Sequence, residues 1–162
     1  MPISLDTFTD TTGACLQNHV PTTGGSWYIL YQTSSTHTIN SNNLQATTGT
    51  AHGITHGISP APTVNDFEIS YRITVTDTST ATRAIGALAR VTDISNYYKL
   101  QHLPTGHASN DTIMSKKVGG TKTTIAQVDT GLAASDVFVF RITDENKVAY
   151  KNGACIISSN DN

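Results

Sequence analysis

Residues 66–76 read Asp-Phe-Glu-Ile-Ser-Tyr-Arg-Ile-Thr-Val-Thr, and this stretch decides the fold class. Five apolar side chains alternate here with polar ones in strict period two: Phe67, Ile69, Tyr71, Ile73 and Val75. Because successive side chains of a strand point to opposite faces, the alternation predicts a strand with one buried and one solvated face.

Runs of similar character flank this strand on both sides. In chain order they cover residues 27–31, 38–40, 44–46, 84–91, 97–102, 112–118, 121–128, 137–143 and 147–151. Gly119-Gly120 is a two-residue hairpin signal, because glycine reaches the positive φ of primed turns. Residues 1–26 indicate one strand and a long loop, and residues 47–63 the longest loop. About ten strands without a helical period predict a single all-β domain over residues 1–162, an antiparallel β-sandwich or jelly roll.

The composition agrees with this fold class. Of the 162 residues, 27 are Thr and 14 are Ser, whereas only two are Glu and 14% are charged. Thr suits the pleated surface of a strand, and both Thr and Ser are poor helix formers. A net charge of −2 gives no basic patch for nucleic acid, and no run approaches the roughly 18 apolar residues of a membrane span. We therefore expect a neutral, hydroxyl-covered exterior with no nucleic-acid or membrane partner.

The N-terminal residues 1–10 have neither the basic nor the apolar region of a secretory signal. We expect synthesis in the cytoplasm, where Cys15 and Cys155 would be free, buried thiols. A disulfide between them stays open as an alternative if the first and last strands are neighbours.

Several motifs resemble one known family. The run GALARVTDISNYYKL at 86–100 resembles the central hairpin of concanavalin A-like, laminin-G-like jelly rolls, in which a G-x-x-x-R strand turns into a Y-Y-x-L strand. Residues 117–121 (KVGGT) and 146–153 (NKVAYKNG) resemble the hairpin and the N-x-x-x-Y-x-N-G strand that follow in that family. Residues 6–27 are similar to the start of lectin-like domains in structural and adhesin-like proteins of tailed bacteriophages. The resemblance implies a lectin-like jelly roll and glycan binding.

The chain departs from this family at its C-terminal end. Family members usually continue for two or three more strands after the N-G strand, whereas this sequence ends nine residues later, at Asn162. We therefore expect the last strands to be absent and a sheet edge to be open to another chain, giving an oligomer or multi-copy assembly. The residues assigned to this assembly edge are Lys147, Val148, Ala149, Tyr150, Ile156 and Ile157.

Enzyme chemistry has little support in the sequence. Glycosidases of this fold need paired carboxylates, but Glu68 and Glu145 stand far apart without a clustered acidic motif. A Gly-x-Ser-x-Gly nucleophile motif is also absent from the sequence. A lyase-like cleft with Arg90, Tyr97 and Lys99 is a minor alternative, and we expect a protein without enzymatic activity.

Calcium is a further candidate ligand, because lectin-like jelly rolls often bind it through Asp carboxylates. Asp6, Asp10 and Asp93 lie at predicted strand ends where such a site could form. Asp is also the ordinary residue of turns, because its side chain bonds to the backbone two residues on. We therefore expect no obligatory cofactor and keep Ca²⁺ as an open alternative.

Glycan binding requires an aromatic ring and a few amides or hydroxyls on the surface. One member of each adjacent aromatic pair must point inward, and we assign Trp27 and Tyr98 to the core. Tyr28, Tyr97 and the neighbouring Asn96 are then the candidate glycan-binding residues.

Two functions follow from these patterns. The first is a non-enzymatic virion protein of a tailed phage, located on the particle as a capsid decoration or a tail or fibre accessory. Its partners would be other virion proteins of the capsid or tail lattice, with weak binding to a cell-surface glycan. The second is a free-standing carbohydrate-binding module.

Overall fold

The computed structural model describes most of the chain, in ten segments. They are residues 6–10, 15–23, 26–31, 37–40, 43–46, 55–59, 66–74, 84–103, 111–144 and 146–161. The chain divides into two compact units, residues 1–63 and residues 64–162, and each is described by itself. The single-domain organisation over residues 1–162 stays a prediction.

The first unit contains two short antiparallel pairs of strands. Strand β1 pairs with β4, β2 forms a hairpin with β3, and a 3₁₀ turn, η1, precedes them. Their bounds are η1 Leu16–Asn18, β1 Ser26–Tyr31, β2 His37–Asn40, β3 Asn43–Ala46 and β4 Thr55–Ser59. The prediction of one long loop over 47–63 is wrong at β4, because pairing with β1 orders a segment that has almost no apolar alternation of its own.

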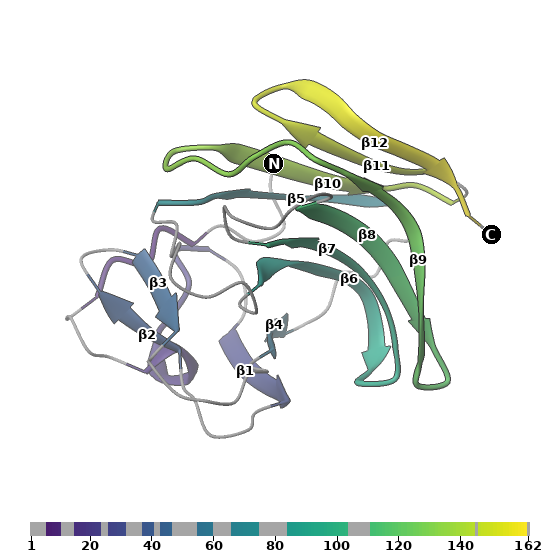
Figure 1. The fold of residues 1–162 in the computed structure, drawn as a ribbon. Coiled ribbons are helices and arrows are strands. Elements are labelled where there is room, and N and C mark those ends of the chain that lie inside the picture. Colours follow the sequence, from purple (N-terminus) through teal and green to yellow (C-terminus); the bar gives the residue numbers. More distant parts are fainter. Residues whose placement is uncertain are drawn as a thin grey trace. The chain divides into compact units, whose positions relative to one another are not determined.

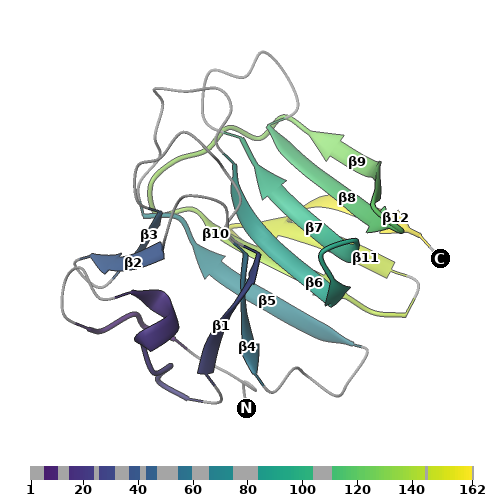
Figure 2. The same ribbon diagram turned by 90° about the horizontal axis from the view of Figure 1, so that it is seen from below.

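The second unit is an antiparallel β-sandwich of two four-stranded sheets, which confirms the predicted fold class. One sheet has the order β12-β11-β10-β5 and the other the order β6-β7-β8-β9. Figures 1 and 2 show the two sheets as separate layers. The strand bounds are β5 Phe67–Arg72, β6 Ile85–Asp93, β7 Asn96–His102, β8 Thr112–Val118, β9 Thr121–Val128, β10 Val137–Ile142, β11 Asn146–Lys151 and β12 Ala154–Asn160.

Strand β5 has the alternation that its sequence predicts. Phe67, Ile69 and Tyr71 are partly buried and pack on the core, whereas Glu68 and Ser70 between them are exposed. The opposing sheet contributes Ala and Leu side chains, and the neighbouring strand β10 contributes two fully buried phenylalanines. The main core is the set Ala87, Ala89, Leu100, Met114, Phe140, Ile142, Ala149 and Ile157. Residues from both sheets meet in it, so hydrophobic burial holds the two layers together.

Glycine-containing turns close two of the hairpins. Gly119 and Gly120, between β8 and β9, have φ of 55° and 87°. Asn152 and Gly153, between β11 and β12, have φ of 50° and 85°. Positive φ at both central residues defines the type I′ turn, whose twist matches that of the flanking strands. The predicted primed turn at Gly119-Gly120 is thus confirmed.

Strand β12 changes the expected position of the sheet border. β11 pairs with β10 on one side and with β12 on the other, so Lys147, Val148, Ala149 and Tyr150 do not lie at a border. The assignment of these residues to an assembly edge is therefore wrong. Among the described strands of this sheet, the border beyond β11 is β12, which carries Ile156 and Ile157. Assembly with another chain through this border stays a prediction.

A chain of polar side chains lies buried at one end of the sandwich. The Tyr71 hydroxyl is 2.5 Å from Nε2 of His102, and Nδ1 of His102 is 3.1 Å from Oγ1 of Thr112. Thr112 Oγ1 is 3.1 Å from Thr130 Oγ1, which lies 3.2 Å from a carboxylate oxygen of Asp111. We call these five residues the Tyr71 network. Because buried polar groups are costly when they are unpaired, this pairing is what allows His102 and Thr112 to be fully buried.

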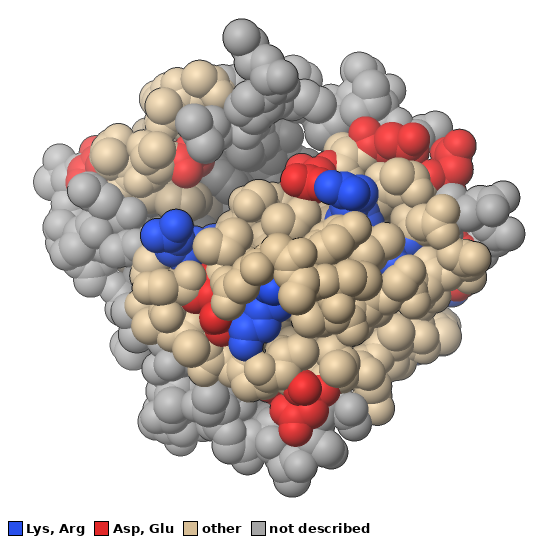
Figure 3. All heavy atoms as spheres, turned by 90° about the horizontal axis from the view of Figure 1, so that it is seen from above, with Lys and Arg blue, Asp and Glu red and all other residues tan. Residues whose placement is uncertain are grey.

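The face of the molecule formed by the outer side of the β12-β11-β10-β5 sheet is largely uncharged. Figure 3 looks down on the uppermost layer of Figure 1, and side chains other than Lys, Arg, Asp and Glu predominate there. Cys15 is half-buried and Cys155 is exposed, and both are free thiols in the structure. The expectation of a buried thiol is wrong for Cys155. No helix in the described part of the chain has the length and apolar character needed to cross a bilayer.

Candidate functional site

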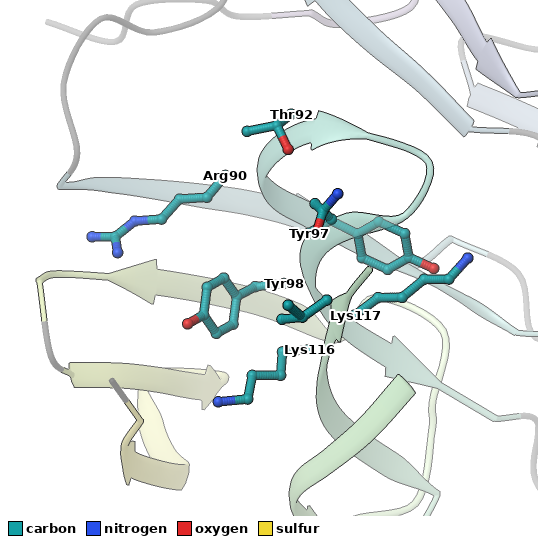
Figure 4. Close-up of a pocket in the computed structure, with 8 residues that line it drawn as sticks. Arg90, Thr92, Tyr97, Tyr98, Lys116 and Lys117 are labelled. Atoms are coloured by element: carbon teal, nitrogen blue, oxygen red, sulfur yellow. The ribbon is translucent and has the colours of Figure 1, made fainter. Parts of the chain in front are cut away.

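A hollow of about 150 Å³ opens where the β6–β7 hairpin meets β8, and we call it the Tyr97 hollow. Its lining residues are Arg90, Thr92, Asn96, Tyr97, Tyr98, Lys116, Lys117 and Val118. Figure 4 shows Tyr97 beside Lys117, and Tyr98 beside Lys116 in another part of the hollow. Hydrogen-bond donors and two aromatic rings therefore surround one small, open space.

The backbone around the hollow departs from regular strand geometry. The register between β6 and β7 shifts between Ala89 and Asp93, and Arg90 has a φ of 47°. A non-glycine residue with positive φ is uncommon and occurs where the surrounding structure holds it in place. Arg90, one of the residues that line the hollow, thus lies within a β-bulge of β6.

A turn cluster fixes the end of the same hairpin. A carboxylate oxygen of Asp93 accepts a hydrogen bond of 2.6 Å from the amide of Ser95, and both its oxygens accept from Nδ2 of Asn96. The bonds from Asn96 and Ser95 hold the pKa of Asp93 below its usual value. Oδ1 of Asn96 accepts from the amide of Gly119, which ties this hairpin to the next one. Asn96 thus shapes the hollow, and its side-chain amide is already hydrogen-bonded to Asp93 and Gly119.

The three basic residues of the hollow have different partners. Lys117 donates to the carbonyl oxygen of Ile94 at 2.9 Å and lies 5.7 Å from the centre of the Tyr97 ring. Lys116 pairs with Asp161 at 2.7 Å. Arg90 has two carboxylates at 3.8 and 3.9 Å, from Asp66 and Asp144.

The C-terminal segment reaches the same region through Asp161. Its carboxylate binds Lys116 of β8, and its carbonyl oxygen accepts a hydrogen bond from the amine of Lys147, a fully buried residue of β11. The bond to Asp161 raises the pKa of Lys116. Burial, together with the nearby Asp161, raises the pKa of Tyr98. We call this arrangement the Asp161 clamp, because it connects one strand from each sheet.

A second hollow, of about 280 Å³, lies on the outer face of the β12-β11-β10-β5 sheet. Its lining residues are Glu68, Val139, Arg141, Tyr150 and Gly153, and we call it the Tyr150 hollow. Figure 3 is a view onto this layer of the sandwich.

The structure brings together two of the three predicted glycan-binding residues. Asn96 and Tyr97 both line the Tyr97 hollow, whereas the side chain of Tyr28 lies outside the described residues. Tyr98 packs against the core, as predicted for the inward member of its pair. Sequence reasoning missed Lys117 and Lys116, although their place opposite Tyr97 and Tyr98 follows once β7 is paired with β8.

The predicted calcium ligands are engaged in other contacts. Asp6 and Asp10 bind the two ring nitrogens of the buried His19, at 2.8 and 3.2 Å. Burial alone would lower the pKa of His19, but the hydrogen bonds with Asp6 and Asp10 outweigh it and raise that pKa. Asp93 belongs to the turn cluster of the second unit. Within the described segments, no group of three or more His, Cys, Asp or Glu side chains is placed to hold a metal ion.

Comparison with known proteins identifies one similar solved structure. No protein-family model matches the chain, and no curated protein matches it. The fold is similar to that of a known carbohydrate-binding module. The similar structure is the carbohydrate-binding module CBM66 from Bacillus subtilis, with a TM-score of 0.65 and 18% sequence identity. The alignment covers 85% of this chain and 80% of the module. This likeness agrees with the lectin-like jelly roll that the sequence predicts.

Proposed function

We propose that the protein is a carbohydrate-binding domain without catalytic activity, and that it holds a saccharide in the Tyr97 hollow. The observation that carries the proposal is the half-buried Tyr97 ring, set among donors from three neighbouring strands. The likeness to a carbohydrate-binding module supports it at the level of the fold.

The chemistry of the hollow suits a sugar. The C–H face of a pyranose or furanose is apolar and packs on an aromatic ring, while its hydroxyl oxygens accept hydrogen bonds. Tyr97 offers the ring, and Lys117 and Thr92 offer donors beside it. Lys117 has a carbonyl and a ring as partners but no carboxylate within ion-pair distance among the described residues, so its remaining N–H groups can donate to a ligand.

The test compares two variants that differ only in the aromatic ring. Tyr97→Ala removes the ring, whereas Tyr97→Phe keeps it and removes the hydroxyl. We expect a screen of soluble oligosaccharides to yield a ligand for the wild type. Isothermal titration should then show roughly tenfold weaker binding in Tyr97→Ala and nearly unchanged binding in Tyr97→Phe.

Two outcomes would contradict the proposal. One is a wild-type protein that binds no saccharide of the screen, and the other is Tyr97→Ala binding as tightly as Tyr97→Phe. Circular dichroism of both variants checks that the fold is kept, so a loss of binding reports on the ring itself.

The virion role stays a prediction from the sequence. A likeness to a carbohydrate-binding module bears on ligand binding and says nothing of a particle, its capsid or tail partners, or the location of the protein. Mass spectrometry of purified particles is the direct test, because a structural component is present there in a fixed number of copies.

A further inference from the structure

The Tyr150 hollow is built from three adjacent strands. Glu68 of β5 lies directly opposite Arg141 of β10, and Val139 lies opposite Tyr150 of β11. Side chains paired in this way stand on one face of a sheet and within reach of one another. The hollow therefore has a fixed arrangement set by backbone pairing, not by a loop.

Arg141 organises the polar side of the hollow. Its Nε donates to Oε2 of Glu68 at 2.9 Å, and one of its terminal nitrogens lies 2.7 Å from the same oxygen. Both contacts use Oε2, so Oε1 of Glu68 has no hydrogen-bond partner among the described residues. The other terminal nitrogen of Arg141 donates to the Tyr150 hydroxyl at 3.5 Å. The Arg141 and Glu68 side chains are 49% and 43% exposed, so the open carboxylate oxygen and part of the guanidinium group are accessible to a ligand.

Tyr150 and Gly153 form the apolar side. The guanidinium carbon of Arg141 lies 5.2 Å from the centre of the Tyr150 ring, a cation–π distance that fixes the ring. Gly153 sits in the turn after β11, and a Cβ built on it would meet nothing within 4 Å. The turn therefore leaves open space at Gly153, and Val139 completes the lining of the hollow.

This set of groups selects a ligand class by its chemistry. An ion pair has no net charge, so neither an anionic nor a cationic ligand gains from it overall. One acceptor next to a row of donors matches two neighbouring hydroxyls, of which one donates its hydrogen and the other accepts. A ring beside the pair matches the apolar C–H face of the same molecule.

We infer that the Tyr150 hollow is a second saccharide site, which binds a neutral sugar through a vicinal diol. Glu68 Oε1 accepts one hydroxyl, Arg141 donates to the adjacent hydroxyl oxygen, and the Tyr150 ring packs on the sugar face. The ligand class rests on the proposed function, but the site shares no residue with the Tyr97 hollow.

The test is a titration followed by backbone amide resonances of the ¹⁵N-labelled full chain. The probes are methyl α-mannopyranoside and methyl α-glucopyranoside, which carry vicinal diols, and tetrahydropyran-2-methanol, which carries the ring but no diol. We expect the two glycosides to shift amides of Val139, Arg141 and Gly153 in the millimolar range, and the diol-free compound to shift none of them.

Conservative variants assign the contacts. Glu68→Gln keeps the shape and removes the charged acceptor, and Tyr150→Ala removes the ring. Each should weaken binding at this hollow roughly tenfold or more. Tyr150→Phe, the matched control, should bind within about threefold of the wild type, since the ring and the ion pair remain. Tyr97→Ala should leave the shifts around Val139 unchanged, because it alters only the other hollow.

The outcomes separate this inference from the proposed function. Shifts confined to amides around Tyr97 would overturn the second site and leave the proposed function standing. Binding of the glycosides near Val139 that is as tight in Glu68→Gln as in the wild type would also overturn diol recognition. The same holds if the diol-free compound produces the same shifts. Shifts around Val139 alone would support the second site and contradict the Tyr97 hollow as the binding site. No shift at either hollow with any probe would contradict both.

Discussion

At Gly86 of β6, the backbone of the paired strand β7 lies too close to leave room for a side chain. A Cβ on Gly86 would lie 1.9 Å from the carbonyl oxygen of Leu100, which real side chains do not tolerate. The clash is with backbone of the paired strand β7, so a rotamer change cannot relieve it. Gly86 is not among the residues with positive φ, so the backbone conformation itself does not demand glycine. Glycine is required here because a larger side chain has no space.

A comparison of two Gly→Ala substitutions tests this reading. Gly86→Ala should lower the free energy of unfolding by about 3 kcal/mol or more, because the β6–β7 pairing must distort. Gly119→Ala should cost only about 1 kcal/mol, because its φ of 55° is strained for alanine but a Cβ there meets nothing within 4 Å. Urea unfolding of both variants provides the measurement, and equal losses would contradict the steric explanation.

His102 gives the protein a calculable pH dependence. Burial lowers the pKa of this side chain to about 4, from an ordinary value of 6.5. Between these two values the unfolded chain binds a proton that the folded chain excludes. The free energy of unfolding should therefore fall as the pH drops from 6.5 to 4, by about 3 kcal/mol in total, and not change further through this group below pH 4.

The variant His102→Gln isolates this contribution. It removes the titrating ring, so its stability should depend less on pH between 6.5 and 4 than that of the wild type. His19 acts with the opposite sign, because its raised pKa gives stability that is present at low pH and lost as the pH rises. Urea titrations at pH 7 and pH 4.5 compare the two proteins, and parallel pH profiles would show that His102 is not the group responsible.

Among single residues, the sequence indicated Tyr97 but not its surroundings. An adjacent Tyr-Tyr pair on a strand must send one ring outward, and that reasoning needs no partner strand. The position of Lys117 over Tyr97 depends on the register between β7 and β8, which the sequence alone does not supply. The alternation over residues 66–76 predicts a solvated face for the polar residues, and Glu68 is exposed there. Its pairing with Arg141, 73 residues later, depends on the strand order of the sheet.

At the scale of elements, the Asp161 clamp links the two sheets. Lys116 comes from β8, and the amine of the buried Lys147 comes from β11, where it also lies 5.1 Å from the Tyr98 ring. We expect Lys116→Ala and Asp161→Ala each to lower the melting temperature by a few degrees, because either change breaks the same contact.

A double-mutant cycle measures this contact directly. The double variant Lys116→Ala/Asp161→Ala should lose less than the sum of the two single losses, because the second change has no ion pair left to break. Added salt should reduce the coupling, since both side chains are partly exposed. Fully additive losses would mean that the clamp contributes nothing to stability.

The elements also show why one strand was visible in the sequence and another was not. β5 follows a regular ladder, so its alternation of burial is intact and predicts the strand. β12 has a register shift opposite Ala149 and Tyr150, and this β-bulge places the adjacent Ile156 and Ile157 both against the core. Two consecutive inward residues break period two, which removed the pattern that would have predicted a strand there.

At the scale of the whole molecule, both hydrophobic clusters consist of residues from 73–157 and their packed neighbours from 67 onward. Among the described residues, the segment 64–162 therefore contains a hydrophobic core made of its own side chains. We expect this segment, expressed alone, to give a dispersed amide spectrum and one cooperative unfolding transition. A collapsed spectrum without a transition would instead favour the single domain over residues 1–162 that the sequence predicts.

The Tyr71 network has a consequence for where its protons reside. A carboxylate only accepts, so the hydroxyl proton of Thr130 points to Asp111, and Thr130 accepts in turn from Thr112. Thr112 is then left to accept from Nδ1 of His102, and Nε2 accepts from the Tyr71 hydroxyl. Through two threonine hydroxyls, the carboxylate of Asp111 thus selects the Nδ1–H tautomer of a buried histidine ring.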